Sequence, residues 1–287
     1  MSTLAALGLG GRRIYNADDP ADRMELRNKS MLPTYSQVIP RDYDRVPVGA
    51  IPGVPAVASG DEFGAPDMLV DKADYQDAIE YAHERQVMPK YAQQASWAPP
   101  GFKYNQDGLG YCWTWGGTAC CMDLQRIHCV DPFIPLAPVS MGFLVGWSNR
   151  GNYLESYIRG ARDQGICAAI DGNINDHRNS ASVWNNQPRP VKLDRVWDID
   201  TRSGKERALQ IMLSCLVYGC PVYIAYNWWG HALCMSALAW EPSKTYSVVM
   251  VIRNSHNEDD FILLEGNKGI PDEMYAFVSL KLGAGPV

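Results

Sequence analysis

Apolar residues follow one spacing in the middle of the chain and another towards its end. Apolar positions three and four residues apart, the spacing of one helix face, predict helices over 71–85, 112–127, 151–165 and 204–219. Continuous or alternating apolar runs predict strands over 221–227, 231–240, 246–255 and 274–280. Because the helices precede the strands instead of alternating with them, the pattern favours an α+β domain with a helical half and a sheet half.

Residues 1–86 differ from the rest in composition. They are rich in proline, aspartate, arginine and glycine, and only 71–85 shows helical periodicity. A segment with so little apolar periodicity should not fold alone. We therefore divide the chain into an extended N-terminal arm with one short helix (1–86) and a packed domain (87–287), and expect the domain to stay folded when the arm is deleted.

Composition and charge narrow the class of protein. Of the 287 residues, 46% are hydrophobic and 20% are charged, which is typical of a globular protein. A net charge of −6 without a long basic run argues against nucleic acid as the partner. The apolar runs are too short to cross a bilayer, and the first residues do not resemble a secretory signal. We expect a protein without membrane contact, not exported by the Sec route, in the cytoplasm or within a virus particle.

The eight cysteines do not show the spacing of a metal site. There is no Cys-x-x-Cys pair and no His-Glu-x-x-His motif, so we expect no metal and no cofactor. Seven of the eight are interpreted as reduced thiols that pack as small hydrophobic side chains.

Cys112 differs from the other cysteines because it stands where a glycine-containing loop meets a predicted helix. Residues 105–115 read NQDGLGYCWTW. A helix N-terminus and a nearby imidazolium both favour the thiolate. We therefore expect Cys112 to be the most reactive thiol, with a pKa well below the free value of about 8.5.

A nucleophilic thiol needs a base, and the base needs a group that orients it. His231 opens an apolar strand after the residues NWWG, so its ring can point into a cleft. Asn254 ends the strand 246–255 and can accept a hydrogen bond from that ring. His83 and His177 lie in polar contexts that predict exposure. The alternative for His231 is a buried core histidine.

Together these residues resemble the papain-like cysteine proteases. The segment KYNQDGLGYCW is similar to the family's glutamine, glycine-rich turn and Gly-x-Cys-Trp block. The family's histidine and asparagine follow its cysteine by about 130–150 residues, close to the spacing found here. GHALCMSALAW is similar to the histidine strand and YSVVMVIRNSHN to the asparagine strand. The resemblance covers about residues 88–282 in order and implies the family's fold, a helical lobe and an antiparallel sheet or barrel lobe.

The resemblance also implies roles for individual residues. Cys112 would be the nucleophile, His231 the general base and then acid, and Asn254 the orienting residue. The side chain of Gln106 and the backbone N–H of Cys112 would form the oxyanion hole. Substrate-binding residues, Gly151 and Asn152, fall where the family has a glycine pair that binds an extended peptide.

Several positions depart from the family's pattern. Leu109 replaces a disulfide cysteine, and Tyr111 replaces a small residue beside the nucleophile. His256 replaces the tryptophan that shields the Asn–His pair, and 257–260 replace a glycine-rich turn. A less shielded pair should have a weaker orienting hydrogen bond and a low turnover.

Three classes of function follow. The first is a cysteine endopeptidase, or a related amidase, that acts on a peptide or protein. The second is a structural or decoration subunit of an assembly such as a virus particle, with the peptidase fold but little or no catalysis. The third, a transglutaminase-like acyl transferase, is disfavoured because its third catalytic residue is usually an aspartate. Residues 1–86 are interpreted either as a prosegment or as an arm that contacts neighbouring subunits, and we favour the arm.

Overall fold

The computed structural model describes residues 2–5, 7–30, 66, 69–85, 105–106, 109–145, 151–178, 180–256 and 261–283. The α-helices are α1 (Pro20–Ser30), α2 (Tyr75–Glu84), α4 (Cys112–Ile127), α5 (Pro138–Leu144), α6 (Leu154–Asp163), α7 (Ala181–Asn185) and α8 (Lys205–Val217). The strands are β1 (Ile14–Asn16), β2 (Val191–Asp198), β3 (Val222–Tyr226), β4 (His231–Trp240), β5 (Val248–Arg253), β6 (Phe261–Glu265) and β7 (Glu273–Leu282). Short 3-10 helices are η2 (Lys72–Asp74), η4 (Ile170–Gly172), η5 (Thr201–Ser203) and η6 (Asn267–Gly269).

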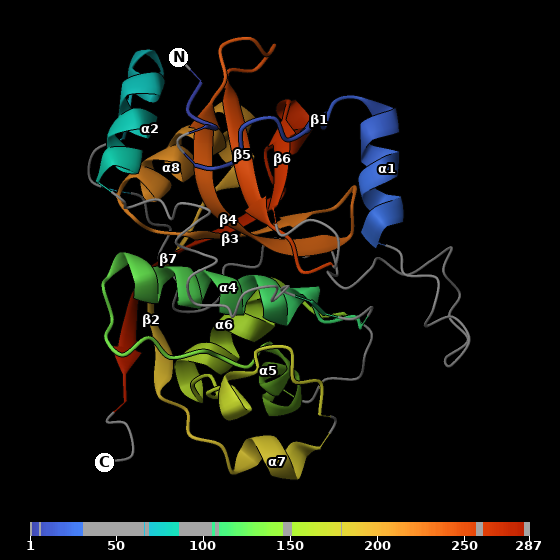
Figure 1. The fold of residues 1–287 in the computed structure, drawn as a ribbon, viewed down its shortest axis with the longest axis vertical. Helices are drawn as coiled ribbons and strands as arrows, with labels where there is room; N and C mark the ends of the chain where they lie inside the picture. The colour runs from blue at the N-terminus through green and yellow to red at the C-terminus, as the bar shows by residue number, and fades with distance from the viewer. Residues whose placement is uncertain are drawn as a thin grey trace.

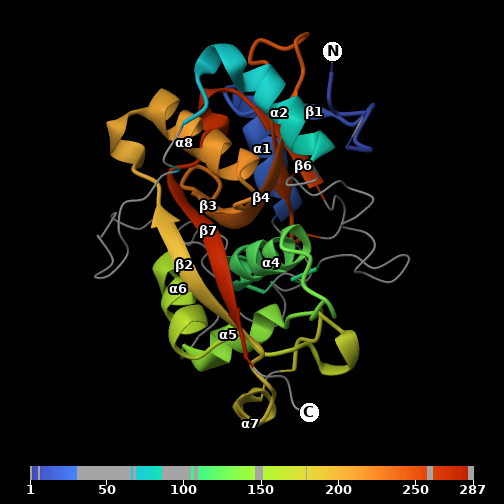
Figure 2. The ribbon, with the colours of Figure 1, turned by 90° about the vertical axis from the view of Figure 1, so that its left-hand side faces the viewer.

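These strands join one sheet in the order β1-β6-β5-β4-β3-β7-β2. β1 pairs with β6 in parallel, and the other neighbours are antiparallel. Figure 1 shows two lobes, with α1, α2 and α8 around the sheet and α5, α6 and α7 below it, and α4 lies between them. In Figure 2 the long strands β2 and β7 run from the sheet down into the helical lobe. The predicted α+β class, with a helical half and a sheet half, is confirmed.

Strand β4 is buried on both faces, and its alternate residues belong to two separate apolar cores. Leu233 and Met235 lie in the core of the sheet lobe, whereas Ala232 and Cys234 lie in the core that contains α4. Successive side chains of a strand point to opposite faces. The strand that begins at His231 therefore runs directly against α4.

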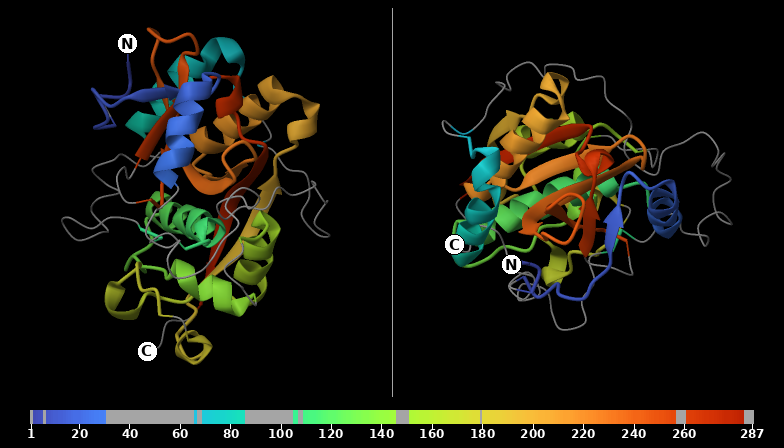
Figure 3. Two further views of the ribbon diagram at one scale, coloured as in Figure 1. Left: turned by 90° about the vertical axis from the view of Figure 1, so that its right-hand side faces the viewer. Right: turned by 90° about the horizontal axis from the view of Figure 1, so that it is seen from above.

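Residues 2–5 and 7–30 are part of the sheet lobe. β1 pairs with β6 from Ile14 opposite Leu263 to Asn16 opposite Glu265, and Figure 3 shows α1 at the outer edge of the sheet. The apolar side chains buried in the sheet core from this segment are Leu4, Leu7, Leu9, Tyr15, Ala17 and Leu26. This differs from the extended arm predicted for residues 1–86, because the partner strand lies near the other end of the chain. Residues 31–65 lie outside the described residues.

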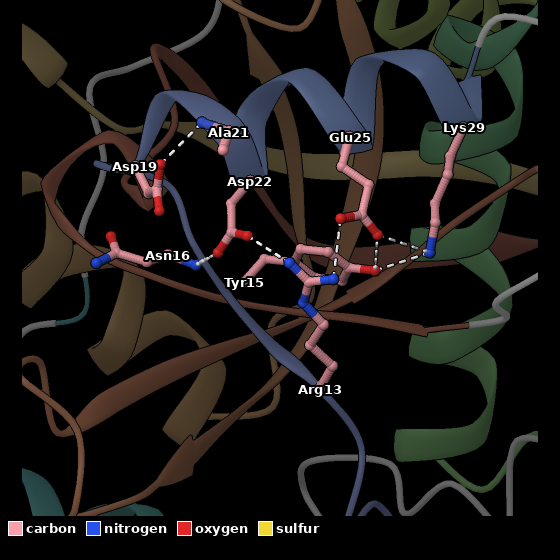
Figure 4. A network of polar contacts seen from close by, with 8 residues as sticks. All are labelled: Arg13, Tyr15, Asn16, Asp19, Ala21, Asp22, Glu25 and Lys29. Atoms are coloured by element: carbon pink, nitrogen blue, oxygen red, sulfur yellow. Dashed lines mark hydrogen bonds and ion pairs between the residues drawn. The ribbon is translucent and has the colours of Figure 1, made fainter.

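Polar contacts fasten α1 to β1, as Figure 4 shows. Arg13 forms ion pairs with Asp22 at 2.6 Å and with Glu25 at 2.9 Å. The amide of Asn16 donates to Asp22 Oδ2 at 2.7 Å. The Arg13 side chain is 55% exposed, and exposed ion pairs contribute about 1 kcal/mol or less. The buried apolar residues therefore hold this segment, and the ion pairs fix the direction of α1.

The predicted helix 71–85 also packs on the sheet lobe, as η2 and α2. His83 Nε2 lies 2.8 Å from the carbonyl oxygen of Leu238 in β4, and His83 is 4% exposed. The prediction that His83 is exposed was wrong, since the ring turns inward from a polar sequence context. The amide of Val70 donates to Ser214 Oγ of α8 at 2.9 Å.

The other predicted elements appear with small changes of boundary. Helices 112–127, 151–165 and 204–219 correspond to α4, α6 and α8, and the four predicted strands correspond to β3, β4, β5 and β7. Helices α1, α5 and α7 and strands β1, β2 and β6 were not predicted. Among the residues described, no helix combines the length and apolar composition needed to span a membrane.

Candidate active site

Cys112 is the first residue of α4, and its sulfur lies against β4. The amide of Ala232 donates a hydrogen bond to Cys112 Sγ at 3.3 Å. One turn further along the helix, a Cβ added to Gly116 would lie 2.9 Å from backbone atoms of Leu233. The absence of a side chain at Gly116 thus lets α4 approach β4 closely enough to bring the thiol beside the residue that follows His231.

His231 and Asn254, which are far apart in the sequence, meet at the start of β4 and just after the end of β5. His231 Nε2 lies 3.3 Å from Asn254 Oδ1. An amide oxygen only accepts, so the proton of the neutral ring sits on Nε2 and leaves Nδ1 as the basic nitrogen. Nδ1 is buried and has no hydrogen-bond partner among the described residues. The ring is therefore oriented by Asn254, with its basic nitrogen available.

Two hydrogen bonds join Gln106 to Ser255, the residue that follows Asn254. Its backbone amide donates to the Ser255 carbonyl oxygen at 2.8 Å, and Ser255 Oγ donates to Gln106 Oε1 at 2.5 Å. Gln106 Nε2 donates one hydrogen to the Leu109 carbonyl oxygen at 2.6 Å. A side-chain amide has two N–H donors, and the contacts of the described residues use one of them. Ser255 was not singled out in the sequence, although it directly follows Asn254.

The described contacts do not link Gly151 or Asn152 to the other predicted site residues. Asn152 Oδ1 accepts from the Tyr153 amide and from Ser156 Oγ, both at 2.9 Å, at the start of α6. Gly151 has φ 74°, a conformation that glycine adopts without strain. Binding of a peptide at these two residues stays a prediction.

Two aromatic rings contact His231. The Trp229 ring centroid lies 5.2 Å away, edge-on at 61°, and that of His256 lies 4.8 Å away at 40°. His256 is 4% exposed and His231 is fully buried. The expectation of a less shielded pair is therefore not met in this structure, although His256 stands where the family has tryptophan. Residues 257–260 lie outside the described residues.

Burial controls the charge state of the pair. Burial raises the pKa of Cys112 to about 12, and the backbone hydrogen bond from Ala232 only partly offsets it. Burial also lowers the pKa of His231 to about 4, against a raising effect of the Asn254 hydrogen bond. The predicted low thiol pKa is thus wrong in this structure, because desolvation outweighs the helix N-terminus. Both groups are neutral here at pH 7.

A buried ion pair links the helix of the nucleophile to the strand of the orienting asparagine. Asp123 of α4 pairs with Arg253 of β5 at 2.8 Å and accepts from Ser236 Oγ of β4 at 2.6 Å. The Asp123 side chain is 0% exposed and the Arg253 side chain is 3% exposed. Asp123 lies three helical turns after Cys112, on the same face, and Arg253 directly precedes Asn254. An aspartate that directly follows the apolar run Ala119–Met122 of α4 was the available signal in the sequence.

The cysteines form no disulfide. All eight cysteines are free, and only Cys129 is exposed. Within the described part of the chain, no cluster of three or more histidine, cysteine, aspartate or glutamate side chains could hold a metal ion.

Comparisons with known proteins point to one fold. No protein-family model matches the chain, and no curated protein matches it. Among solved structures, the bromelain protease from Ananas comosus matches 64% of this chain and 97% of its own, with 13% identity and a TM-score of 0.50.

Two other solved structures match less well. They are digestive procathepsin L 3 of the Tenebrio molitor larval midgut (12% identity, 62% of this chain, 66% of that chain, TM-score 0.46) and xylellain from Xylella fastidiosa (15%, 66%, 85%, 0.44). The chain spans less than two thirds of the procathepsin. With the two lobes and the order of the elements, the likeness to bromelain shows that this chain has the papain-like cysteine protease fold.

Proposed function

We propose that the protein is a papain-like cysteine peptidase, or a related amidase, that works through an acyl-enzyme. The observation that carries the proposal is the hydrogen bond at 3.3 Å between His231 Nε2 and Asn254 Oδ1, next to a residue whose amide binds Cys112 Sγ. A thiol, a base and an orienting amide on one helix end and two strands are the parts that nucleophilic catalysis needs.

The reaction follows from the position of each group. His231 Nδ1 takes the proton of the Cys112 thiol, and the sulfur attacks the substrate carbonyl carbon. The resulting oxyanion accepts hydrogen bonds from Gln106 Nε2 and from the backbone N–H of Cys112. The proton on Nδ1 then passes to the leaving amine as the C–N bond breaks. Water, deprotonated by His231, hydrolyses the thioester and releases the acid and the free thiol.

This reaction requires a more open state than the one described. Cys112, His231 and Gln106 are each 0% exposed, so a substrate carbonyl cannot reach the sulfur until the site opens. Opening also hydrates the pair and removes the desolvation that holds both groups neutral. Access and activation of the thiol are therefore coupled.

A hydrolysis assay with matched variants tests the proposal. Internally quenched peptides of varied sequence are incubated with wild type, Cys112→Ala and Cys129→Ala, the last removing the exposed thiol as control. We expect cleavage by wild type and Cys129→Ala and none by Cys112→Ala. Cleavage that persists in Cys112→Ala would overturn the assignment.

The second candidate is a structural or decoration subunit of an assembly such as a virus particle. The observation that favours it is the complete burial of a neutral thiol and a neutral imidazole. It predicts no peptide cleavage by folded wild type, and incorporation into the assembly that is equal for wild type and Cys112→Ala.

A further inference from the structure

Three aromatic side chains form a stack that ends on His231. Trp228 and Trp229 stack with ring centroids 5.3 Å apart and an interplanar angle of 16°. Tyr226 contacts both, at 5.5 Å and 6.0 Å. Trp229 in turn contacts His231 at 5.2 Å. We call Tyr226, Trp228 and Trp229 the aromatic stack. Its position fixes one wall around the imidazole.

The polar ends of the aromatic stack are fastened to η6. Trp228 Nε1 donates to the Lys268 carbonyl oxygen at 3.0 Å, and the Tyr226 hydroxyl donates to the Gly269 carbonyl oxygen at 2.7 Å. Each ring thereby has a fixed tilt as well as a packing contact. A movement of η6 would carry both rings with it.

η6 is held by a residue of the N-terminal segment. Asp18 accepts from the Asn267 amide through Oδ2 and from the Lys268 amide through Oδ1, both at 2.9 Å. Although partial burial disfavours its charge, these two backbone donors lower the pKa of Asp18. A Cβ at Gly266, which has φ 99°, would come within 3.0 Å of Asp18 Oδ2. The close fit at Gly266 indicates that Asp18 is seated in this turn and does not merely lie near it.

We propose that Asp18 is a positioning residue for His231, acting through η6 and the aromatic stack. Each link is a hydrogen bond or a ring contact, and the chain of contacts runs from the half-buried Asp18 through the exposed Asn267 and Lys268 of η6 to the buried imidazole. Displacing the N-terminal segment from β6 would release η6 and loosen the wall of the site. The inference rests on the proposed function only for the role of His231 as base.

The experiment compares Asp18→Ala with Asp22→Ala. Asp22 is a matched control, since it lies on the same segment and binds Arg13 and the Asn16 amide but not η6. The readouts are the imidazole NMR signals of His231, the rate of Cys112 alkylation by iodoacetamide, and kcat and KM on any cleaved peptide. The first two readouts need no hydrolysis, so they separate failure of this inference from failure of the proposed function.

We expect Asp18→Ala to shift the His231 signals and to change the alkylation rate and kcat by about 2- to 30-fold, the range for residues coupled at a distance. KM should stay near the wild-type value, and Asp22→Ala should behave like wild type. Asp18→Asn keeps one acceptor oxygen, so its His231 signals and alkylation rate should lie between those of Asp18→Ala and wild type.

Trp228→Phe keeps the N-terminal segment intact, removes the donor to Lys268 and leaves a smaller ring in the aromatic stack, so it is the second variant if Asp18→Ala does not fold. It should shift the His231 signals in the same direction. Unchanged His231 signals and an unchanged alkylation rate in a folded Asp18→Ala protein, or in Trp228→Phe, would overturn the proposal and leave Asp18 a structural residue.

Discussion

Gly116 is the position where the packing of α4 on β4 most directly controls the site. A Cβ at this residue would lie 2.9 Å from both the amide nitrogen and the carbonyl carbon of Leu233. These are backbone atoms of a buried strand, and they cannot turn aside as a side-chain end can. Replacing Gly116 by alanine must therefore move α4 away from β4, and Cys112 with it.

The expected change in the free energy of unfolding for Gly116→Ala has two parts. Overpacking a core costs about 1–3 kcal/mol, whereas alanine is about 1 kcal/mol better than glycine inside a helix. Gly116→Ala should thus lose about 0–2 kcal/mol in the free energy of unfolding. The effect on reactivity should be larger, since a misplacement of about 1 Å can cost about 100-fold. We expect at least a tenfold change in the alkylation rate of Cys112.

Gly160→Ala is the matched control. Gly160 is also a buried helical glycine, but a Cβ there would meet the ends of the Val145 and Met141 side chains, at 2.7 Å and 2.9 Å. Side-chain methyl groups can shift more easily than strand backbone, so Gly160→Ala should lose less stability than Gly116→Ala. Urea unfolding gives the free energies, and mass spectrometry gives the alkylation rates. Equal stability and equal rates for the two variants would refute the close approach of α4 to β4.

Three further predictions concern stability. Asp123→Ala removes the carboxylate from the buried Arg253 guanidinium and should cost about 3–5 kcal/mol in urea unfolding; a loss below about 1 kcal/mol would contradict a buried ion pair. Leu9→Ala, at a residue 1% exposed in the sheet core, should lower the free energy of unfolding by about 2–5 kcal/mol. Deletion of residues 2–19 should abolish folding. A stable truncated protein would instead support the interpretation of this segment as an extended arm. His231 has a folded pKa of about 4 below its usual 6.5, so the unfolded chain binds the proton first and stability should fall by roughly 3 kcal/mol as the pH drops from about 6.5 to about 4. His231→Gln should make that part of the stability–pH curve shallower but leave a slope from the buried His256, whose pKa burial also lowers. An unchanged curve would count against a buried neutral ring at His231.

The sequence predicted the elements whose residues carry their own signal. Helix α4 and strand β4 are apolar over many residues, because both are buried on more than one side. The meeting of His231 with Asn254 was expected from strand ends that resemble those of a known family. For these elements the local sequence pattern was sufficient to predict the structure.

The remainder depends on partners that are distant in the sequence. β1 has only three residues, and its pairing with β6 is decided by a strand near the other end of the chain. The ion pair between Asp123 and Arg253 joins two residues whose spacing shows no motif. The raised pKa of Cys112 results from burial by the whole fold, and no local reading of residues 105–115 contains that information.

The central claim is that Cys112, activated by His231, is the nucleophile, and labelling with a peptidyl epoxide tests it most directly. Wild type and His231→Ala are treated at pH 7, and mass spectrometry locates the label among the eight cysteines. The account predicts label on the buried Cys112 in preference to the exposed Cys129, and loss of that label in folded His231→Ala. Two results would contradict it. One is modification of the exposed Cys129 before Cys112, and the other is equal labelling of Cys112 in wild type and His231→Ala.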